Sequence, residues 1–276
     1  MAGGVKSKLP LVSVIITTKN SSNTLNRCLK SIKNQSYQNT EIIVIDNNST
    51  DNTKEIAKKY TKLIFNKGPE RSAQRNFGAR KSKGVYLYIV DSDFVLDSSV
   101  VKECVEEAKK GFDAVVVHNS PDTSVSWIAK IRKFEVDMYK YDISHSAARF
   151  FKRKTFFDIK GYNEKVIAGE DYDLQNKLSR QKYKTGFINS EALHLGEPKH
   201  FFSHMRKYYE YGKDFVNYKK DNEEESKKQL GFFRPVYFKN LGKFFTNPIL
   251  GTGFILYHTC KFGFGGTGYL VGRLGK

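Results

Sequence analysis

The chain has 276 residues, of which 39% are hydrophobic and 28% charged, a composition that excludes wholesale disorder and indicates a folded globular protein. Its 47 basic residues outnumber 29 acidic ones, and the net charge of +18 favours an anionic partner such as nucleic acid, an anionic membrane or a phosphorylated substrate. Three widely spaced cysteines exclude a disulfide framework and a zinc ribbon, and no apolar run reaches the roughly 18 residues of a membrane-spanning helix or the pattern of a signal peptide.

The first half of the chain alternates strand and helix patterns. We expect strands over residues 11–17, 41–46, 63–65, 85–90 and 114–118, and helices over 21–34, 50–60, 70–82 and 98–110. This order predicts an α/β fold with a mostly parallel sheet and helices on both faces. Because ligands of such sheets bind beyond the carboxyl ends of the strands, the polar residues at those ends are the first candidates for a site. They are Thr17, Thr18, Asp46, Asp91 and Asp93.

The second half is less regular. Helices are expected over 124–141, 170–180 and 200–220, a strand over 147–151, and a pair of strands over 186–194. From Ser226 onward there are eight basic residues and no acidic one, with many interleaved aromatic residues. This change of composition indicates a separate C-terminal segment.

Three local motifs could have a chemical role, and each also has an ordinary structural explanation. Asp91-Ser-Asp93 follows a strand and could hold a divalent ion, or it could be a polar turn. Glu170 and Asp171 begin a helix, where acids are also common for reasons of the helix dipole. Arg71 and Arg75 share a helix face that could contact a diphosphate or simply face solvent.

Taken together and in order, six motifs resemble those of family 2 glycosyltransferases. They occupy residues 12–20, 45–51, 75–78, 91–93, 161–164 and 169–174. The resemblance, closest to prokaryotic membrane-associated mannosyltransferases and dolichyl-phosphate sugar transferases, implies the GT-A fold and inversion at the anomeric carbon. The resemblance covers about residues 9–220, which we expect to form a catalytic domain with a nucleotide-binding half (9–118) and an acceptor-binding half (119–220). We also expect a disordered N-terminus (1–8) and, from its composition, a membrane-interface segment at the C-terminus (221–276).

The resemblance also implies roles for individual residues. The nucleotide would contact Thr17, Thr18, Asn20, Asp46, Arg71, Arg75, Asp91 and Ser92, with Asp46 on the base and Arg75 on the base or diphosphate. Asp91 and Asp93 would hold Mn²⁺ or Mg²⁺, with His194 as a further ligand. Asp171 would be the general base, oriented or assisted by Glu170. The donor would be GDP-mannose or, almost equally, a UDP-hexose.

The basic, aromatic C-terminal segment predicts binding to an anionic bilayer at the cytoplasmic face of the cell membrane. Each surface Lys or Arg contributes about 1 kcal/mol to such binding, and aromatic side chains favour the interface. We therefore expect a peripheral, monotopic enzyme with a lipid-linked or polyprenyl-phosphate acceptor. Candidate acceptor or membrane contacts are Arg149, Arg153, Lys154, Arg234, Lys239 and Lys243. The alternative is a helical layer that caps the catalytic domain or makes an oligomer contact.

Other functions stay open at this stage. The enzyme could instead be a soluble glycosyltransferase with a glycan or protein acceptor. A nucleic-acid-binding protein fits the charge, but no helix-turn-helix, RRM, KH or zinc spacing is present. A non-catalytic nucleotide-binding relative is disfavoured by the intact acidic motifs. A processive polysaccharide synthase would require a Q-x-x-R-W motif and several membrane spans, which the sequence does not contain.

Overall fold

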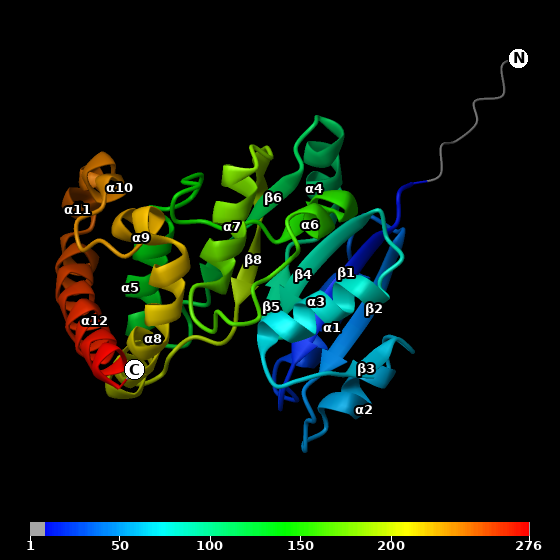
Figure 1. The fold of residues 1–276 in the computed structure, drawn as a ribbon, viewed down its shortest axis with the longest axis horizontal. Helices are drawn as coiled ribbons and strands as arrows, with labels where there is room; N and C mark the ends of the chain where they lie inside the picture. The colour runs from blue at the N-terminus through cyan, green and yellow to red at the C-terminus, as the bar shows by residue number, and fades with distance from the viewer. Residues whose placement is uncertain (1–8, 276) are drawn as a thin grey trace, which may run out of the picture.

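An eight-stranded mixed sheet in the order β3-β2-β1-β4-β7-β6-β8-β5 lies at the centre of the structure, a computed structural model that describes residues 9–275 (Figure 1). The strands are β1 (Val12–Thr18), β2 (Thr40–Asp46), β3 (Ile64–Asn66), β4 (Tyr86–Asp91), β5 (Phe94–Leu96), β6 (Ala114–Pro121), β7 (Phe150–Lys152) and β8 (Thr185–His194). Strands β1 to β4 are parallel, whereas β7 is antiparallel to β4 and β6, and β5 is antiparallel to β8. Strands β6 and β8 are again parallel. The expectation of a mostly parallel sheet is therefore confirmed for four of the seven strand pairings, whereas β5 and β7, which pair antiparallel, make the sheet mixed.

Helices cover both faces of the sheet, as the alternating pattern predicts. One face is covered by α1 (Leu25–Lys33), α2 (Thr53–Lys58) and α4 (Val100–Lys109), and the other by α3 (Arg71–Lys81), α6 (Arg153–Asp158) and α7 (Glu170–Arg180). Strand β1 shows why both faces need cover. Its Val12, Val14 and Ile16 join one core while Ile15 joins the other, and all four are fully buried.

A helical layer stands beside the sheet, on the left in Figure 1. It consists of α5 (Trp127–Val136), α8 (Phe201–Asp221), α9 (Glu223–Gln229), α10 (Pro235–Lys239), α11 (Leu241–Thr246) and α12 (Pro248–Leu274). A third core, which includes Phe134, Met205, Val236, Phe254 and Tyr257, joins α5, α8, α10 and α12. The C-terminal segment therefore packs against α5 and α8, within residues 119–220. Within residues 9–275, every helix is too short or too polar to cross a membrane.

Several elements differ from the sequence-based expectations. The pair of strands expected over 186–194 is one strand, β8, and the helix expected over 124–141 is the shorter α5, which begins after the cap residue Ser126. Strand β5 and helix α6 were not predicted. Strand β5 pairs with β8 and so aligns Phe94 with His194, which brings His194 to the loop that follows β4. The expected disorder of residues 1–8 lies outside the described residues.

Candidate functional site

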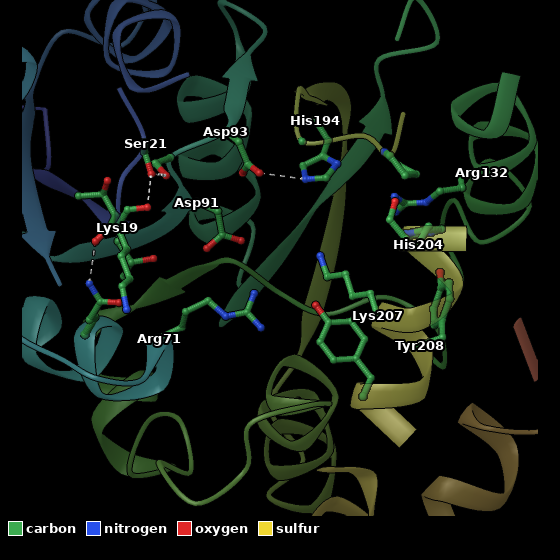
Figure 2. A pocket seen from close by; sticks show the side chains of 18 residues that line it. Lys19, Ser21, Arg71, Asp91, Asp93, Arg132, His194, His204, Lys207 and Tyr208 are labelled. Atoms are coloured by element: carbon green, nitrogen blue, oxygen red, sulfur yellow. Dashed lines mark hydrogen bonds and ion pairs between the residues drawn. The ribbon is translucent and has the colours of Figure 1, made fainter. Parts of the chain in front are cut away.

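A cavity of about 490 Å³ opens at the carboxyl ends of β1 and β4, where the sheet meets the helical layer (Figure 2). Its walls come from segments far apart in the chain, because neighbouring parallel strands bring their ends together. Lining side chains include Thr17, Thr18, Lys19 and Ser21 after β1, Arg71 and Gln74 on α3, Asp91, Ser92 and Asp93 after β4, His194 after β8, Arg132 on α5, and His204, Lys207, Tyr208 and Tyr211 on α8.

Cations dominate the charge of this cavity. Lys19, Arg71, Arg132 and Lys207 line it, against the two carboxylates Asp91 and Asp93. Figure 2 shows the side chains of Arg71 and Lys207 extending into the space opposite Asp93. Such a polar cavity with excess positive charge suits an anionic ligand such as a diphosphate.

Arg75 is the centre of a buried ion network beside the cavity. Its guanidinium is fully buried, with Nη2 2.9 Å from Asp91 and Nη1 3.1 Å from both Glu170 and Asp171. Arg75 was expected to face the base or the diphosphate, whereas in this structure three carboxylates surround it and it does not line the cavity. Its effect is to fasten the D-x-D motif to the Glu-Asp motif that begins α7.

Arg149 completes this network. It lies 3.1 Å from the second oxygen of Asp91 and 2.8 Å from the second oxygen of Asp171. Burial alone would raise the pKa of Asp91, but the guanidinium groups of Arg75 and Arg149 hold it well below its usual range. Burial and the adjacent Asp171 carboxylate raise the pKa of Glu170. Arg149, expected as a contact to an acceptor or membrane, thus joins the two acidic motifs instead.

Asp93 and His194 form the only predicted ligand pair that stays free of this arginine network. The Nε2 atom of His194 lies 3.2 Å from Asp93, and its Nδ1 lies 2.5 Å from Glu197, which fixes the ring. Burial lowers the pKa of His194, but the two carboxylates outweigh this effect and raise it to about 9. A Cβ atom at Gly196 would lie 2.4 Å from the Asp93 carboxylate, so a larger residue here would displace that side chain.

The donor set fits a divalent ion only in part. Across residues 9–275 no cluster of three or more His, Cys, Asp or Glu side chains is arranged to hold a metal. Asp93 and His194 offer one oxygen and one nitrogen, a pair compatible with Mn²⁺ if a ligand supplies further oxygens. Asp91 has both oxygens paired with arginines, so it contributes to the site through that network.

Two predicted nucleotide contacts organise the loop after β2. The Asp46 carboxylate is buried and accepts hydrogen bonds from the backbone and hydroxyl of Ser49, 2.9 and 2.5 Å away. Asn20 accepts a hydrogen bond from the backbone of Thr50. Neither side chain lines the cavity. Thr18 does, and its buried hydroxyl has no hydrogen-bond partner among the described residues, which leaves it available to a ligand.

The remaining basic candidates lie elsewhere. Arg153 donates to the carbonyl groups of Ala79 and Ser82 at the end of α3, and Lys154 pairs with Asp158, so both have local structural partners. Lys243 donates to the carbonyl of Asp137, and Lys239 is exposed. Arg234, expected near a membrane or acceptor, is buried in the helical layer, where it donates to Tyr139.

Sequence reasoning missed the part of the cavity that α8 builds. Lys207, Tyr208 and Tyr211 follow helical spacing, which indicated only an aromatic-rich helix. Glu197 was also missed, although its position three residues after His194 was a usable signal. Arg132 lines the cavity from α5 while pairing with Glu197 at 3.0 Å, and this contact could not be read from local pattern.

Residues 13–163, more than half of the chain, match the model of the family described as Glycosyl transferase family 2. Among curated proteins, chondroitin synthase of Escherichia coli is 27% identical over 186 residues, which are 62% of this chain and 27% of that protein. The GalNAc(5)-diNAcBac-PP-undecaprenol beta-1,3-glucosyltransferase of Campylobacter jejuni is 26% identical over 180 residues, which are 59% of this chain and 58% of that protein. The chain thus spans well under two thirds of the length of these relatives.

Solved structures share the fold at low sequence identity. A mannosyltransferase from Pyrobaculum calidifontis, in complex with GDP-Man and Mn²⁺, matches with a TM-score of 0.61 and 17% identity over 98% of this chain and 77% of that one. TarS of S. aureus in complex with UDP-GlcNAc matches with a TM-score of 0.53 and 18% identity over 73% of this chain and 64% of that one.

Proposed function

This chain is a glycosyltransferase that belongs to family 2 and uses a nucleotide-sugar donor, and from this premise we propose that it transfers one sugar to a lipid-linked acceptor at a membrane surface. The observation that carries the proposed transfer is the joining of the two acidic motifs beside a cationic cavity, and the lipid-linked acceptor is suggested by the Campylobacter relative, whose name includes PP-undecaprenol. Arg75 and Arg149 each contact both Asp91 and Asp171, so the donor motif and the base motif have a fixed relation.

The donor we propose is GDP-mannose, with a UDP-hexose as the next choice. The Pyrobaculum neighbour, whose structure contains GDP-Man, matches over 98% of this chain, which favours the guanine nucleotide. The nucleotide would enter the cavity along Thr17 and Thr18, with its diphosphate between Arg71, Lys207 and Lys19. Asp46 and Asn20 would support the base through the loop after β2.

Asp93 and His194 would hold Mn²⁺ or Mg²⁺ together with oxygens of the donor. Such an ion neutralises the negative charge that develops on the departing nucleoside diphosphate. The protein's own share of this stabilisation comes from Arg71 and Lys207, whose charges face the same space. Glu197 orients the His194 ring by accepting a hydrogen bond from its Nδ1–H group. This contact leaves Nε2 directed at Asp93.

Asp171 is the proposed general base. An acceptor hydroxyl attacks the anomeric carbon and gives its proton to Asp171, while the bond from that carbon to the diphosphate breaks and its electron pair leaves with the nucleotide. In this structure both Asp171 oxygens are paired, with Arg75 and Arg149, and Asp171 does not line the cavity, so its action as a base requires one of these contacts to open toward the bound acceptor. If the acceptor is a phosphate, its oxygen is already ionised near pH 7, so loss of the base costs less.

Calorimetric titration of the purified protein with GDP-mannose, UDP-glucose and UDP-N-acetylglucosamine, with Mn²⁺ or with EDTA, tests the donor. We expect binding of one donor with Mn²⁺ and at least tenfold weaker binding in EDTA or in Asp93→Asn. Asp171→Asn should keep donor binding and lose transfer. Binding of no donor by the folded protein, with and without anionic liposomes, would reject the donor site. Near wild-type transfer by Asp171→Asn would reject the base.

A further inference from the structure

A second cavity, of about 550 Å³, lies within the helical layer between α5, α7, α8, α9 and α12. Most of its wall comes from residues after 163, beyond the segment that matches the family model. Three residues, Arg132, Tyr208 and Tyr211, line both this cavity and the first one. The two spaces therefore meet at the side of α8 that faces the donor cavity.

Facing stripes of α8 and α12 form the long walls of the second cavity. The lining positions on α8 are 208, 211, 212, 215 and 219, and those on α12 are 262, 265, 266 and 269. Intervals of three and four residues place each set on one helix face. Gly266 contributes open space, since a Cβ atom built there meets nothing within 4 Å.

The wall combines apolar surface with an excess of positive charge. Its apolar and aromatic members include Tyr172, Phe215, Leu230, Phe262 and Tyr269. Five cationic side chains, Arg132, Lys219, Lys227, Arg234 and Lys261, line it, against one acid, Glu135. Arg132, Lys227 and Lys261 pair with carboxylates, whereas Lys219 and Arg234 have no ion pair among the described residues. An apolar chain gains free energy against such a wall, and an anionic group is favoured by the two unpaired cations.

Buried polar atoms in the wall are arranged around Glu135. Its carboxylate accepts hydrogen bonds from Lys261 and Tyr139, both at 2.9 Å. Burial raises the pKa of Glu135, but the positive charges of Lys261 and Arg234 outweigh this effect and lower the pKa to about 2. Arg234 donates to Tyr139 at 2.7 Å and has no carboxylate within ion-pair distance among the described residues. The Nε2 atom of His145 is buried without a partner in that same part of the chain.

We propose that this second cavity binds the acceptor, a lipid with a long apolar chain and a phosphate-bearing head. The apolar chain lies between α8 and α12, and the head lies toward Arg132, Tyr208 and Tyr211, where the cavities meet. This inference rests on the proposed function, because it assigns the acceptor of the same reaction. It also explains why the C-terminal segment packs as a wall of the catalytic unit.

Farnesyl phosphate is a suitable probe, with farnesol and inorganic phosphate as its separated halves. By titration calorimetry we expect farnesyl phosphate to bind at least tenfold more tightly than farnesol and inorganic phosphate not to bind. Gly266→Leu, which fills the open space, should weaken the binding of farnesyl phosphate at least tenfold. The matched control is Gly263→Leu on the same helix, which also meets nothing within 4 Å and does not line the cavity. It should bind like the wild type.

A second, smaller substitution guards against misfolding. Gly266→Cys and Gly263→Cys are labelled with N-ethylmaleimide, with partly exposed Cys260 as a common background. Farnesyl phosphate should slow labelling at least fivefold at position 266 and leave it unchanged at 263. Equal effects at both positions would overturn the proposal. It would also be overturned if a free oligosaccharide such as cellopentaose bound more tightly than farnesyl phosphate and Gly266→Leu abolished that binding.

Donor titrations separate this inference from the proposed function. Both leucine variants should bind the nucleotide sugar as the wild type does, because neither position lines the first cavity. If no protein binds a donor while farnesyl phosphate still protects position 266, the proposed function fails and the lipid site stands. If donors bind and farnesyl phosphate does not, the lipid site is rejected alone.

Discussion

At the scale of single residues, one buried arginine organises the candidate site. Arg75 is 0% exposed and lies within 3.1 Å of Asp91, Glu170 and Asp171. A buried guanidinium costs much desolvation free energy, which is recovered only when its carboxylate partners are close and well placed. The sequence motif identified Arg75 as a site residue, but its burial depends on α7, which is almost 100 residues away in the chain and could not be anticipated locally.

Arg75→Met should therefore be strongly destabilising. It leaves three carboxylates near one another with only Arg149 and Arg71 to compensate, and breaking such a buried network costs about 3–5 kcal/mol. The control is Arg71→Met, since Arg71 is 49% exposed and lies 3.5 Å from Glu170, a contact worth at most about 1 kcal/mol. Urea unfolding monitored by circular dichroism measures both. Equal losses in the two variants would contradict the central role of Arg75.

A buried histidine in the helical layer makes stability depend on pH. His204 lies 3.0 Å from the hydroxyl of Tyr257, and burial, with Arg132, Lys207 and Lys261 nearby, lowers its pKa to about 3. Because the unfolded chain protonates near pH 6.5, the unfolded state binds more protons than the folded state between about pH 6.5 and 3. The stabilisation is complete above pH 6.5 and falls as the pH decreases through this window.

Lowering the pH from 7.5 to 5.0 should cost about 2 kcal/mol of unfolding free energy through His204 alone. His204→Gln removes this titration and keeps a hydrogen-bonding side chain, so its loss over the same range should be smaller by that amount. Urea unfolding at the two pH values provides the comparison. The same pH loss in wild type and variant would show that His204 is not held neutral.

At the scale of helices and strands, the local sequence pattern predicted the strands of the first half of the sheet. It failed for strands that form only by pairing with residues far away in the sequence. Runs such as Val12–Thr18 are β-branched and apolar, so their strands are specified locally. Strand β5 has three residues and exists through its pairing with β8, about 100 residues later, so no local signal marks it. The C-terminal segment was expected either on a bilayer or as a helical layer that caps the catalytic domain. Helix α12 packs against α8 and α5, as the second alternative has it, but no local pattern identified α8 as its partner.

Glycine at the α8–α12 contact gives a direct test of this packing. A Cβ atom at Gly212 would lie 2.2 Å from the carbonyl oxygen of Gly265, too close unless the helices move apart. Gly212→Ala should lower the unfolding free energy by about 1–3 kcal/mol, despite the better helix propensity of alanine. Gly263→Ala, in open space, should raise it by up to about 1 kcal/mol. A gain in both variants would mean that the two helices are not in contact.

At the scale of the whole molecule, charge and exposed apolar surface coincide in the C-terminal helices. Phe245, Ile249 and Leu274 are 81%, 72% and 87% exposed, and they lie in α11 and α12. The chain carries a net charge of +18, and the last 51 residues hold no acid. Exposed apolar side chains beside a basic surface are typical of interfacial membrane contacts. Composition alone therefore indicated this surface, whereas the cavity behind it required the packing of five helices.

We expect the protein to co-sediment with vesicles that contain anionic lipid and to bind at least tenfold less to neutral phosphatidylcholine vesicles. Binding should weaken with salt, because screening reduces the attraction of Lys and Arg to lipid phosphates.

The double variant Phe245→Ser and Ile249→Ser should bind anionic vesicles several-fold more weakly, since both side chains would leave water on binding. Val85→Ser, which removes a 57% exposed apolar side chain before β4, is the matched control and should bind normally. Equal binding to neutral and anionic vesicles, or an equal loss in the control, would place the contact elsewhere and reject α11 and α12 as the membrane surface.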